Sequence, residues 1–124
     1  MDAAPLLLLF LLAKSRASKF LSLDELRALA RQAGFPDPIL AAAVAMAESR
    51  GNARAMGDFG LGGLGFTSFG LWQIHTPAHP EFRFVDLFDP ATNARAAMAI
   101  SKNGAKWTDW STFNHGDYLR YMNP

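Results

Sequence analysis

In this 124-residue chain, the carboxyl group of Glu48 is expected among apolar side chains, where an ionised group is energetically unfavourable. Glu48 follows nine residues, 39–47, none of which has a polar side chain. On a helix, Ala41, Val44 and Ala45 would share a face with Glu48 and surround its carboxyl with apolar side chains. Such surroundings raise the pKa of a carboxyl, and so does the negative end of a helix dipole. A carboxyl that stays protonated near neutral pH is what a general acid requires.

Another interpretation of Glu48 involves no chemistry. At the end of a helix its side chain could bend out into water, or it could pair with Arg50 or Arg54. Structural ion pairs perturb carboxyl groups as active sites do, so the sequence leaves both interpretations open.

Capping residues determine where Glu48 falls on its helix. Asp37 is a good N-cap, Pro38 suits the first helical position, and Gly51 is expected to form a left-handed C-cap. Glu48 is therefore expected in the last turn. Because the helix is apolar on every face before that turn, it is predicted to run through the middle of the domain.

Two further segments carry helix signals. Residues 22–33 open with Ser22 and Glu25 at the spacing of a capping box, and Gly34 can end the helix.

The second of these segments begins at Asp89 and Pro90, which repeat the N-cap and proline pattern, and it is expected to run to Gly104. Asn93 lies on its packed face and is therefore expected to have a specific hydrogen-bond partner.

A glycine-rich segment separates these helices. Six of the ten glycines fall within residues 57–70, which predicts a loop with unusual backbone angles or one short hairpin. No Lys-Ser/Thr pair follows, so the spacing does not fit a phosphate-binding loop. A backbone with so few side chains can let an extended ligand approach closely, or it can simply be mobile.

The histidines that follow do not make a convincing metal site. His75 and His79 lie four apart, which would suit a metal on a helix, but Pro77 and Pro80 disfavour a continuous helix and no third ligand is evident. We expect no metal and no cofactor.

The late aromatic residues are expected to form a lid on the core: Trp107, Trp110, Phe113, Tyr118 and Tyr121.

Composition limits the chain to one compact domain. Half of the residues are hydrophobic, which is enough for one core in a chain of this length. Twelve basic and eleven acidic residues give a net charge of +1, which argues against a nucleic-acid partner. The absence of cysteine excludes disulfides and thiol chemistry.

The first 20 residues stand apart from the predicted domain, residues 21–124. Leu6–Leu12 is a run of seven apolar residues, far fewer than the roughly 20 that cross a bilayer. It could be a secretory signal or a membrane-surface segment, although Asp2 precedes the run and the cationic residues follow it. The alternative is a leading helix that docks on this domain, on another protein or on a second copy.

Four motifs occur together in a definite order. They are an apolar helix ending in Glu-Ser-x-Gly-Asn, a Gly-rich segment leading to Gly-Leu-Trp-Gln-Ile, a helix opening Asp-Pro-x-x-Asn-Ala, and a late aromatic-Asn-x-Gly. In this order they resemble the soluble lytic transglycosylase domain of the lysozyme-like superfamily. The stretches SFGLWQIH, LFDPATNARAAMAI and WTDWSTF are similar to versions found in tail and virion-associated lysins of bacteriophages.

This resemblance implies a mainly α, lysozyme-like α+β fold. Its central buried helix would end at the catalytic Glu48, with a Gly-rich loop or small hairpin beside it and other helices around it. The remaining residues implied to bind substrate or support the site are Ser49, Ser68, Trp72, Gln73, Asn93, Phe113 and Asn114. Phe113 stands where the family usually has tyrosine, which removes a hydroxyl near the acid. Trp72 stands where methionine is commoner.

The activity implied by the resemblance is cleavage of the glycan strand of peptidoglycan between N-acetylmuramic acid and N-acetylglucosamine. Glu48 would protonate the glycosidic oxygen and then accept the proton of the muramic acid 6-hydroxyl. A hydrolytic lysozyme would instead need a second carboxylate, for which Asp58 is best placed in the sequence and Asp86 next. A non-catalytic wall-binding or virion structural module with the same fold is a further alternative.

The resemblance also implies partners and a location. The partner would be peptidoglycan glycan strands. The run Leu6–Leu12 lies outside the resemblance, and its apolar side chains could instead bind other virion proteins or a second copy. The protein would act in a virion or outside the cytoplasmic membrane. Contact of the apolar run with a membrane remains open.

Overall fold

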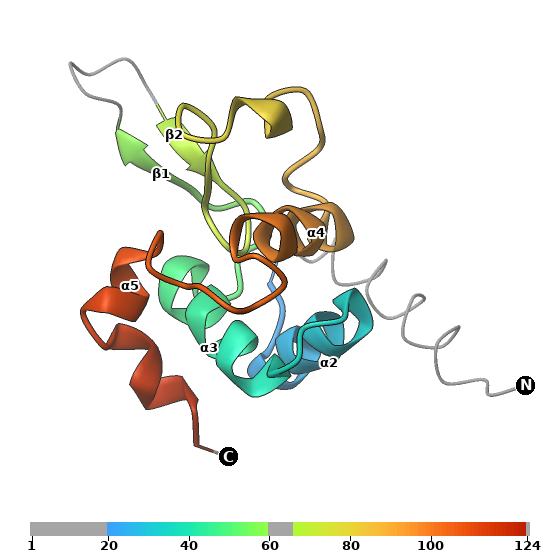
Figure 1. Cartoon of the computed structure of the whole chain (residues 1–124), viewed down its shortest axis with the longest axis vertical. Coiled ribbons are helices and arrows are strands. Elements are labelled where there is room, and N and C mark those ends of the chain that lie inside the picture. The colour runs from blue at the N-terminus through green and yellow to red at the C-terminus, as the bar shows by residue number, and fades with distance from the viewer. Residues whose placement is uncertain (1–19, 60–65, 124) are drawn as a thin grey trace, which may run out of the picture.

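The computed structural model describes residues 20–59 and 66–123. The apolar run Leu6–Leu12 lies outside the described residues. The elements are α2 (Leu23–Ala33), α3 (Pro38–Ser49), β1 (Met56–Phe59), β2 (Phe66–Phe69), β3 (Ile74–His75), η1 (Pro80–Phe82), α4 (Pro90–Ile100), α5 (Ser111–Asn114) and η2 (Asp117–Tyr121). In Figure 1 the small sheet stands at one end of the molecule, α2 and α3 lie at the other, and the C-terminal α5 and η2 lie beside α3.

Helix α2 forms as its capping residues predict. The Ser22 hydroxyl accepts from the Glu25 backbone N–H at 3.1 Å, and the Glu25 carboxylate accepts from the Ser22 N–H at 2.9 Å. Gly34 ends the helix in the left-handed conformation, with φ of 96°. Leu26, Leu29 and Ala30 on its apolar face are buried. The capping box and the glycine cap are therefore both confirmed.

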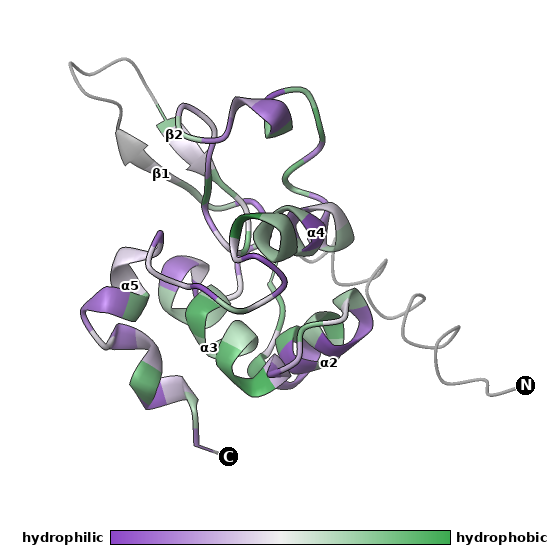
Figure 2. Ribbon diagram, in the orientation of Figure 1, coloured by the Kyte–Doolittle hydropathy of each residue, from purple (hydrophilic) through white to green (hydrophobic). Residues whose placement is uncertain are grey.

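Helix α3 is the central buried helix that the sequence predicts. The Asp37 carboxylate accepts from the Leu40 N–H at 3.1 Å, and Pro38 is the first helical residue. The five residues from Ala41 to Ala45 are all fully buried. Figure 2 shows the difference in character, because α3 is coloured largely hydrophobic whereas α2 alternates between hydrophobic and hydrophilic.

The end of α3 differs by one residue from the prediction. Arg50, not Gly51, is the C-cap, with φ of 57° and its N–H donating to the Met46 carbonyl at 2.8 Å. Gly51 is also left-handed, with φ of 82°, and its carbonyl accepts from the Leu21 N–H at 2.8 Å. Gly51 is left-handed, as predicted. It does not cap α3, however, and its carbonyl instead accepts the hydrogen bond from Leu21.

Helix α4 begins as predicted and ends early. The Asp89 carboxylate accepts from the Thr92 N–H at 3.1 Å at the N-terminus. The last helical residue is Ile100 and not a residue next to Gly104. The reason is that Lys102 and Asn103 adopt positive φ angles of 53° and 62°, which a right-handed helix cannot accommodate.

The glycine-rich segment contains the short hairpin that was one of the two sequence expectations. β1 pairs antiparallel with β2, and β2 pairs antiparallel with β3. Ser68 stands opposite Gly57 on one side and opposite His75 on the other. The hairpin therefore brings the glycine-rich backbone next to the strand that carries His75.

An aromatic cluster joins the helices to the C-terminal segment. Phe35 stacks on Trp72 and on Trp107, with ring centroids 5.8 and 5.5 Å apart, and Trp107 lies 5.0 Å from Trp110. All four aromatic residues are buried, so the expected lid is confirmed for Trp107 and Trp110.

Among the described residues no helix combines the length and apolar character needed to cross a membrane. The fold is mainly α with a small sheet, as predicted.

Candidate active site

Glu48 lines a groove of about 430 Å³. The other lining residues are Gln73, His75, Ala78, His79, Asp109, Trp110 and Ser111. They come from three places in the chain: the end of α3, β3 with the turns on either side of it, and the start of α5 with the residues before it. We refer to this set as the Glu48 groove.

The carboxyl of Glu48 is held at the groove and does not extend freely into water. The side chain is half-buried, and the Thr112 hydroxyl donates to its Oε2 at 2.6 Å. Behind it, Val44 and Ala45 are fully buried, so the predicted apolar stripe is confirmed. Arg50 and Arg54, the pairing candidates in the non-chemical interpretation, are exposed.

Gln73 lies against the hairpin. Its backbone is left-handed, with φ of 47°, and its Nε2 donates to the carbonyls of Ala55 at 3.1 Å and Gly70 at 3.0 Å. A Cβ at Gly57 would collide with Oε1 of Gln73. Glycine at position 57 therefore lets the Gln73 side chain lie against the hairpin backbone, and a larger residue there would push the end of that side chain aside.

Trp72 and Asn93 form a buried brace beneath the groove. The Trp72 backbone N–H donates to Oδ1 of Asn93 at 2.8 Å, and the indole N–H donates to the Ala41 carbonyl at 3.0 Å. Nδ2 of Asn93 donates to the carbonyls of Phe69 at 2.9 Å and Leu87 at 2.8 Å. Both side chains are 0% exposed.

The contacts of Trp72 and Asn93 can be compared with what the sequence predicted for them. Asn93 has the specific hydrogen-bond partners expected for a polar residue on the packed face of its helix, so that prediction is confirmed. Neither Trp72 nor Asn93 has exposed side-chain surface, so of the two roles implied by the resemblance, binding substrate and supporting the site, their positions fit only support.

Ser49 and Ser68 are likewise buried. The Ser49 hydroxyl donates to the Ala45 carbonyl at 2.9 Å and accepts from the Gly51 N–H at 3.2 Å, so it closes the end of α3. The Ser68 hydroxyl lies 3.1 Å from Nδ1 of His75, at hydrogen-bond distance. Neither serine is among the residues that line the groove, but Ser68 contacts His75, which is one of them.

Phe113 and Asn114 also lie outside the groove lining. The Phe113 ring stacks on Tyr118 with centroids 4.9 Å apart, and Nδ2 of Asn114 donates to the Thr108 carbonyl at 2.8 Å. The hydroxyl next to Glu48 comes from Thr112, one position before Phe113. Thr112 was not among the predicted site residues, because it contacts a residue 64 positions away and no local pattern indicates such a contact. Its signal in the sequence was its place beside Phe113 in the late motif.

Of the two carboxylates suggested for a hydrolytic mechanism, Asp86 is placed away from the Glu48 groove. Asp86 lines a separate pocket of about 400 Å³ with Phe69 and Phe88. Asp58 belongs to β1, and its side chain lies outside what the structure describes. Among the described residues, Asp109 is the carboxylate that lines the groove together with Glu48, and no motif in the sequence pointed to it.

Asp109 pairs with a histidine across the groove. Its Oδ2 lies 3.6 Å from Nε2 of His79, and the side chains are 49% and 22% exposed. His75 ends β3 and His79 precedes η1, so the two histidines do not share a helix. Within residues 20–59 and 66–123, no group of three or more His, Asp or Glu side chains could hold a metal ion.

Comparison with known proteins identifies the family. A family model described as a lysozyme-like domain matches residues 27–112, which is more than half of the chain and includes Glu48, Gln73 and Thr112. No curated protein and no solved structure matches the chain. The matched range, the buried helix that ends at Glu48 and the groove beside it agree with one another: the chain belongs to the lysozyme-like domain family of the soluble lytic transglycosylase type, whose substrate is peptidoglycan.

Proposed function

We propose that this protein cleaves the β-1,4 bond between N-acetylmuramic acid and N-acetylglucosamine in peptidoglycan, with Glu48 as the acid. The observation that carries the proposal is the position of Glu48. Its carboxyl stands at the end of a fully apolar helix and lines an open groove together with Gln73. An acid needs both features, because apolar surroundings favour its protonated form and an open groove admits substrate.

The lining of the groove suits a glycan. Ala78 offers apolar surface to the face of a sugar ring, while Gln73, His79 and Ser111 offer polar groups to hydroxyls and amides. The volume of about 430 Å³ is within the usual range for ligand sites. The groove is open, as a site for an extended strand must be.

The proposed reaction is an intramolecular transfer that needs one carboxyl group. Protonated Glu48 gives its proton to the glycosidic oxygen, and the bond from that oxygen to C1 of muramic acid breaks as an oxocarbenium-like centre develops. The 6-hydroxyl of the same sugar then attacks C1 and gives its proton to the Glu48 carboxylate. The products are a free 4-hydroxyl on N-acetylglucosamine and a 1,6-anhydro-muramic acid end, and Glu48 is protonated again.

Hydrolysis is a second candidate, and Asp109 is the observation that favours it. Asp109 lines the same groove and is paired with His79, so it is placed where a base could activate water. Water would then replace the 6-hydroxyl as the nucleophile, and the product would carry a reducing muramic acid end.

Mass analysis of digested peptidoglycan distinguishes the two reactions. Purified peptidoglycan is digested with the full chain and with the Asp109→Asn variant. We expect muramic acid ends that are one water molecule lighter than reducing ends, and we expect the variant to form the same product. Reducing ends only, lost in Asp109→Asn, would establish hydrolysis with Asp109 as the base. No cleavage by any preparation would favour a non-catalytic wall-binding module.

The proposed substrate also suggests a place of action. Peptidoglycan lies outside the cytoplasmic membrane, so we propose that the protein works there, either as part of the cell envelope or carried by a virion. Immunogold labelling of the producing cells and of any virions they release tests this, and label confined to the cytoplasm would contradict it.

A further inference from the structure

The Thr112 hydroxyl contacts the carboxyl to which we assign the proton transfer. The bond runs from Oγ1 of Thr112 to Oε2 of Glu48 and is 2.6 Å long. A length of about 2.5–2.7 Å is typical of a hydroxyl bonded to a carboxylate, the stronger class of hydrogen bond. It joins the last turn of α3 to α5, two elements that are distant in sequence.

The residues on either side of Thr112 fix its position. The indole N–H of Trp110 donates to the Trp72 carbonyl at 2.8 Å, and Trp110 is only 5% exposed. On the other side, Phe113 stacks on Tyr118. Threonine itself has a restricted first side-chain torsion because it is branched at Cβ. The hydroxyl is therefore held at a defined place with little freedom to follow a moving carboxyl.

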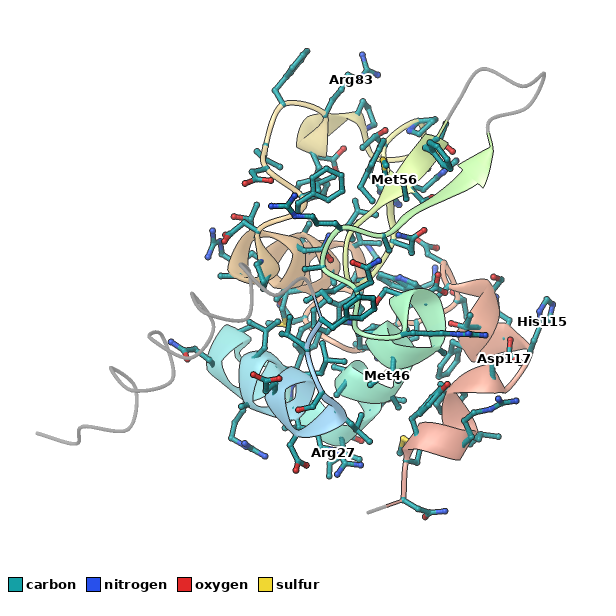
Figure 3. The ribbon with its side chains drawn as sticks, turned by 180° about the vertical axis from the view of Figure 1, so that it is seen from behind. Arg27, Met46, Met56, Arg83, His115 and Asp117 are labelled. Carbon is teal, nitrogen blue, oxygen red and sulfur yellow. The ribbon has the colours of Figure 1, made fainter. Side chains whose placement is uncertain are left out.

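The far end of the same segment is tied down as well. Nη2 of Arg27, on α2, donates to the carbonyls of Tyr121 at 3.2 Å and Asn123 at 3.3 Å. Figure 3 shows Arg27 on α2, while His115 and Asp117 project outward from the C-terminal segment. The segment that carries Thr112 is thus anchored at both ends, by Trp110 and through Arg27.

A glutamate side chain has three rotatable bonds, so its carboxyl can take up many positions when nothing selects one. General acid catalysis requires the carboxyl within hydrogen-bond reach of the oxygen that it protonates. An anchored donor that bonds one carboxyl oxygen selects a single orientation. We propose that Thr112 is a positioning residue, whose hydroxyl holds the Glu48 carboxyl over the groove for proton transfer. The proposal rests on the proposed function of Glu48 as the acid.

Removal of the Thr112 hydroxyl should shift the pH dependence of activity in a predictable direction. A hydroxyl that donates to a carboxylate stabilises the ionised form relative to the acid. Without it, Glu48 stays protonated to higher pH, and the alkaline limb of the activity profile moves to higher pH. The other titratable groups that line the groove, His75, His79 and Asp109, are the same in every variant, so their contributions cancel in the comparison.

The experiment compares three variants of the full chain. Thr112→Val keeps the shape of the side chain and removes the hydroxyl, and Thr112→Ser keeps the hydroxyl. Thr108→Val makes the same chemical change at an exposed position of the same segment. For each variant, kcat and KM on purified peptidoglycan are measured across pH, and the titration of the Glu48 carboxyl carbon is followed by NMR in the absence of substrate.

We expect Thr112→Val to lower kcat by about 10-fold to 100-fold with little change in KM, since misplacing a catalytic group affects the chemical step. Its alkaline limb and its NMR titration should both move to higher pH. Thr112→Ser and Thr108→Val should behave like the wild type. A Thr112→Val variant with unchanged kcat and unchanged titration would overturn the proposal. Equal impairment of Thr112→Ser would overturn it too, because the hydroxyl would then not be the active feature.

Failure of this proposal can be told apart from failure of the proposed function. Glu48→Gln is assayed in the same series. If Glu48→Gln is active, the assignment of the acid is wrong, whatever Thr112 does. If Glu48→Gln is inactive and Thr112→Val matches the wild type, only the role of Thr112 is refuted. The NMR titration needs no catalysis, so it tests the contact even in a protein that cleaves nothing.

Discussion

Asn93 illustrates how much one buried side-chain amide contributes to the stability of this protein. Its side chain bonds the backbone at Phe69, Trp72 and Leu87 and is 0% exposed. Asn93→Leu keeps a similar volume but leaves one N–H and two carbonyls buried without partners. Each such group costs about 1–3 kcal/mol, so we expect the free energy of unfolding to fall by about 3 kcal/mol or more. Urea denaturation followed by circular dichroism measures the loss.

Asn114→Leu is the matched control for this residue. Asn114 is exposed, and its side chain makes a single bond to the Thr108 carbonyl. Its replacement should change the free energy of unfolding by less than about 1 kcal/mol. Similar losses in the two variants would contradict the role of Asn93 as a brace.

Residues could be predicted from the sequence where their own helix determined their surroundings. Glu48 and Asn93 were both singled out because helical spacing placed them among apolar neighbours. Trp72 was assigned by resemblance alone, and the structure buries it against Phe35 instead. Thr112 and Asp109 could not be predicted, because their roles depend on contacts with residues at least 30 positions away.

The junction between α3 and the chain that follows depends on a close backbone contact at Gly51. Its φ is 82°, and a Cβ there would collide with the Leu21 carbonyl. Gly51→Ala combines a left-handed alanine with this collision, so we expect it to lower the free energy of unfolding by about 2–4 kcal/mol. Thermal denaturation monitored by circular dichroism is the measurement.

Gly116→Ala is the control for Gly51→Ala. Its φ is 78°, close to that of Gly51, but the nearest atom to an added Cβ is Cδ1 of Leu119 at 3.4 Å. Gly116→Ala therefore carries the backbone strain without the collision and should cost only about 1 kcal/mol. If both alanine variants lost the same stability, the contact with Leu21 would not be the cause.

Elements were predictable where a local signal marks the boundary. Ser22, Asp37 and Asp89 all cap helices as the sequence indicates, since a capping bond spans only three residues. The end of α4 was predicted too late. Lys102 and Asn103 adopt left-handed angles without being glycine. The Asn-Gly pair at 103–104 favours a turn, but nothing at Lys102 or before it marks the end of the helix.

At the scale of the whole molecule, the groove depends on the return of the C-terminal segment. Asp109, Trp110 and Ser111 complete a wall that begins with Glu48, and Arg27 holds the end of that segment through two backbone carbonyls. The family and the mainly α fold could be predicted from the order of the motifs. The lining of the groove could not, because it is assembled from parts of the chain more than 60 residues apart.

The central claim is that Glu48 supplies the proton for glycan cleavage. The most direct measurement is the rate at which Glu48→Gln releases soluble fragments from purified peptidoglycan, relative to the wild type, with circular dichroism and the unfolding midpoint taken on the same samples. The amide keeps the shape of the side chain and has no transferable acid proton. We predict a folded variant whose activity falls by about 100-fold or more, the contribution typical of a general acid. A folded variant that cleaves at the wild-type rate would contradict the account.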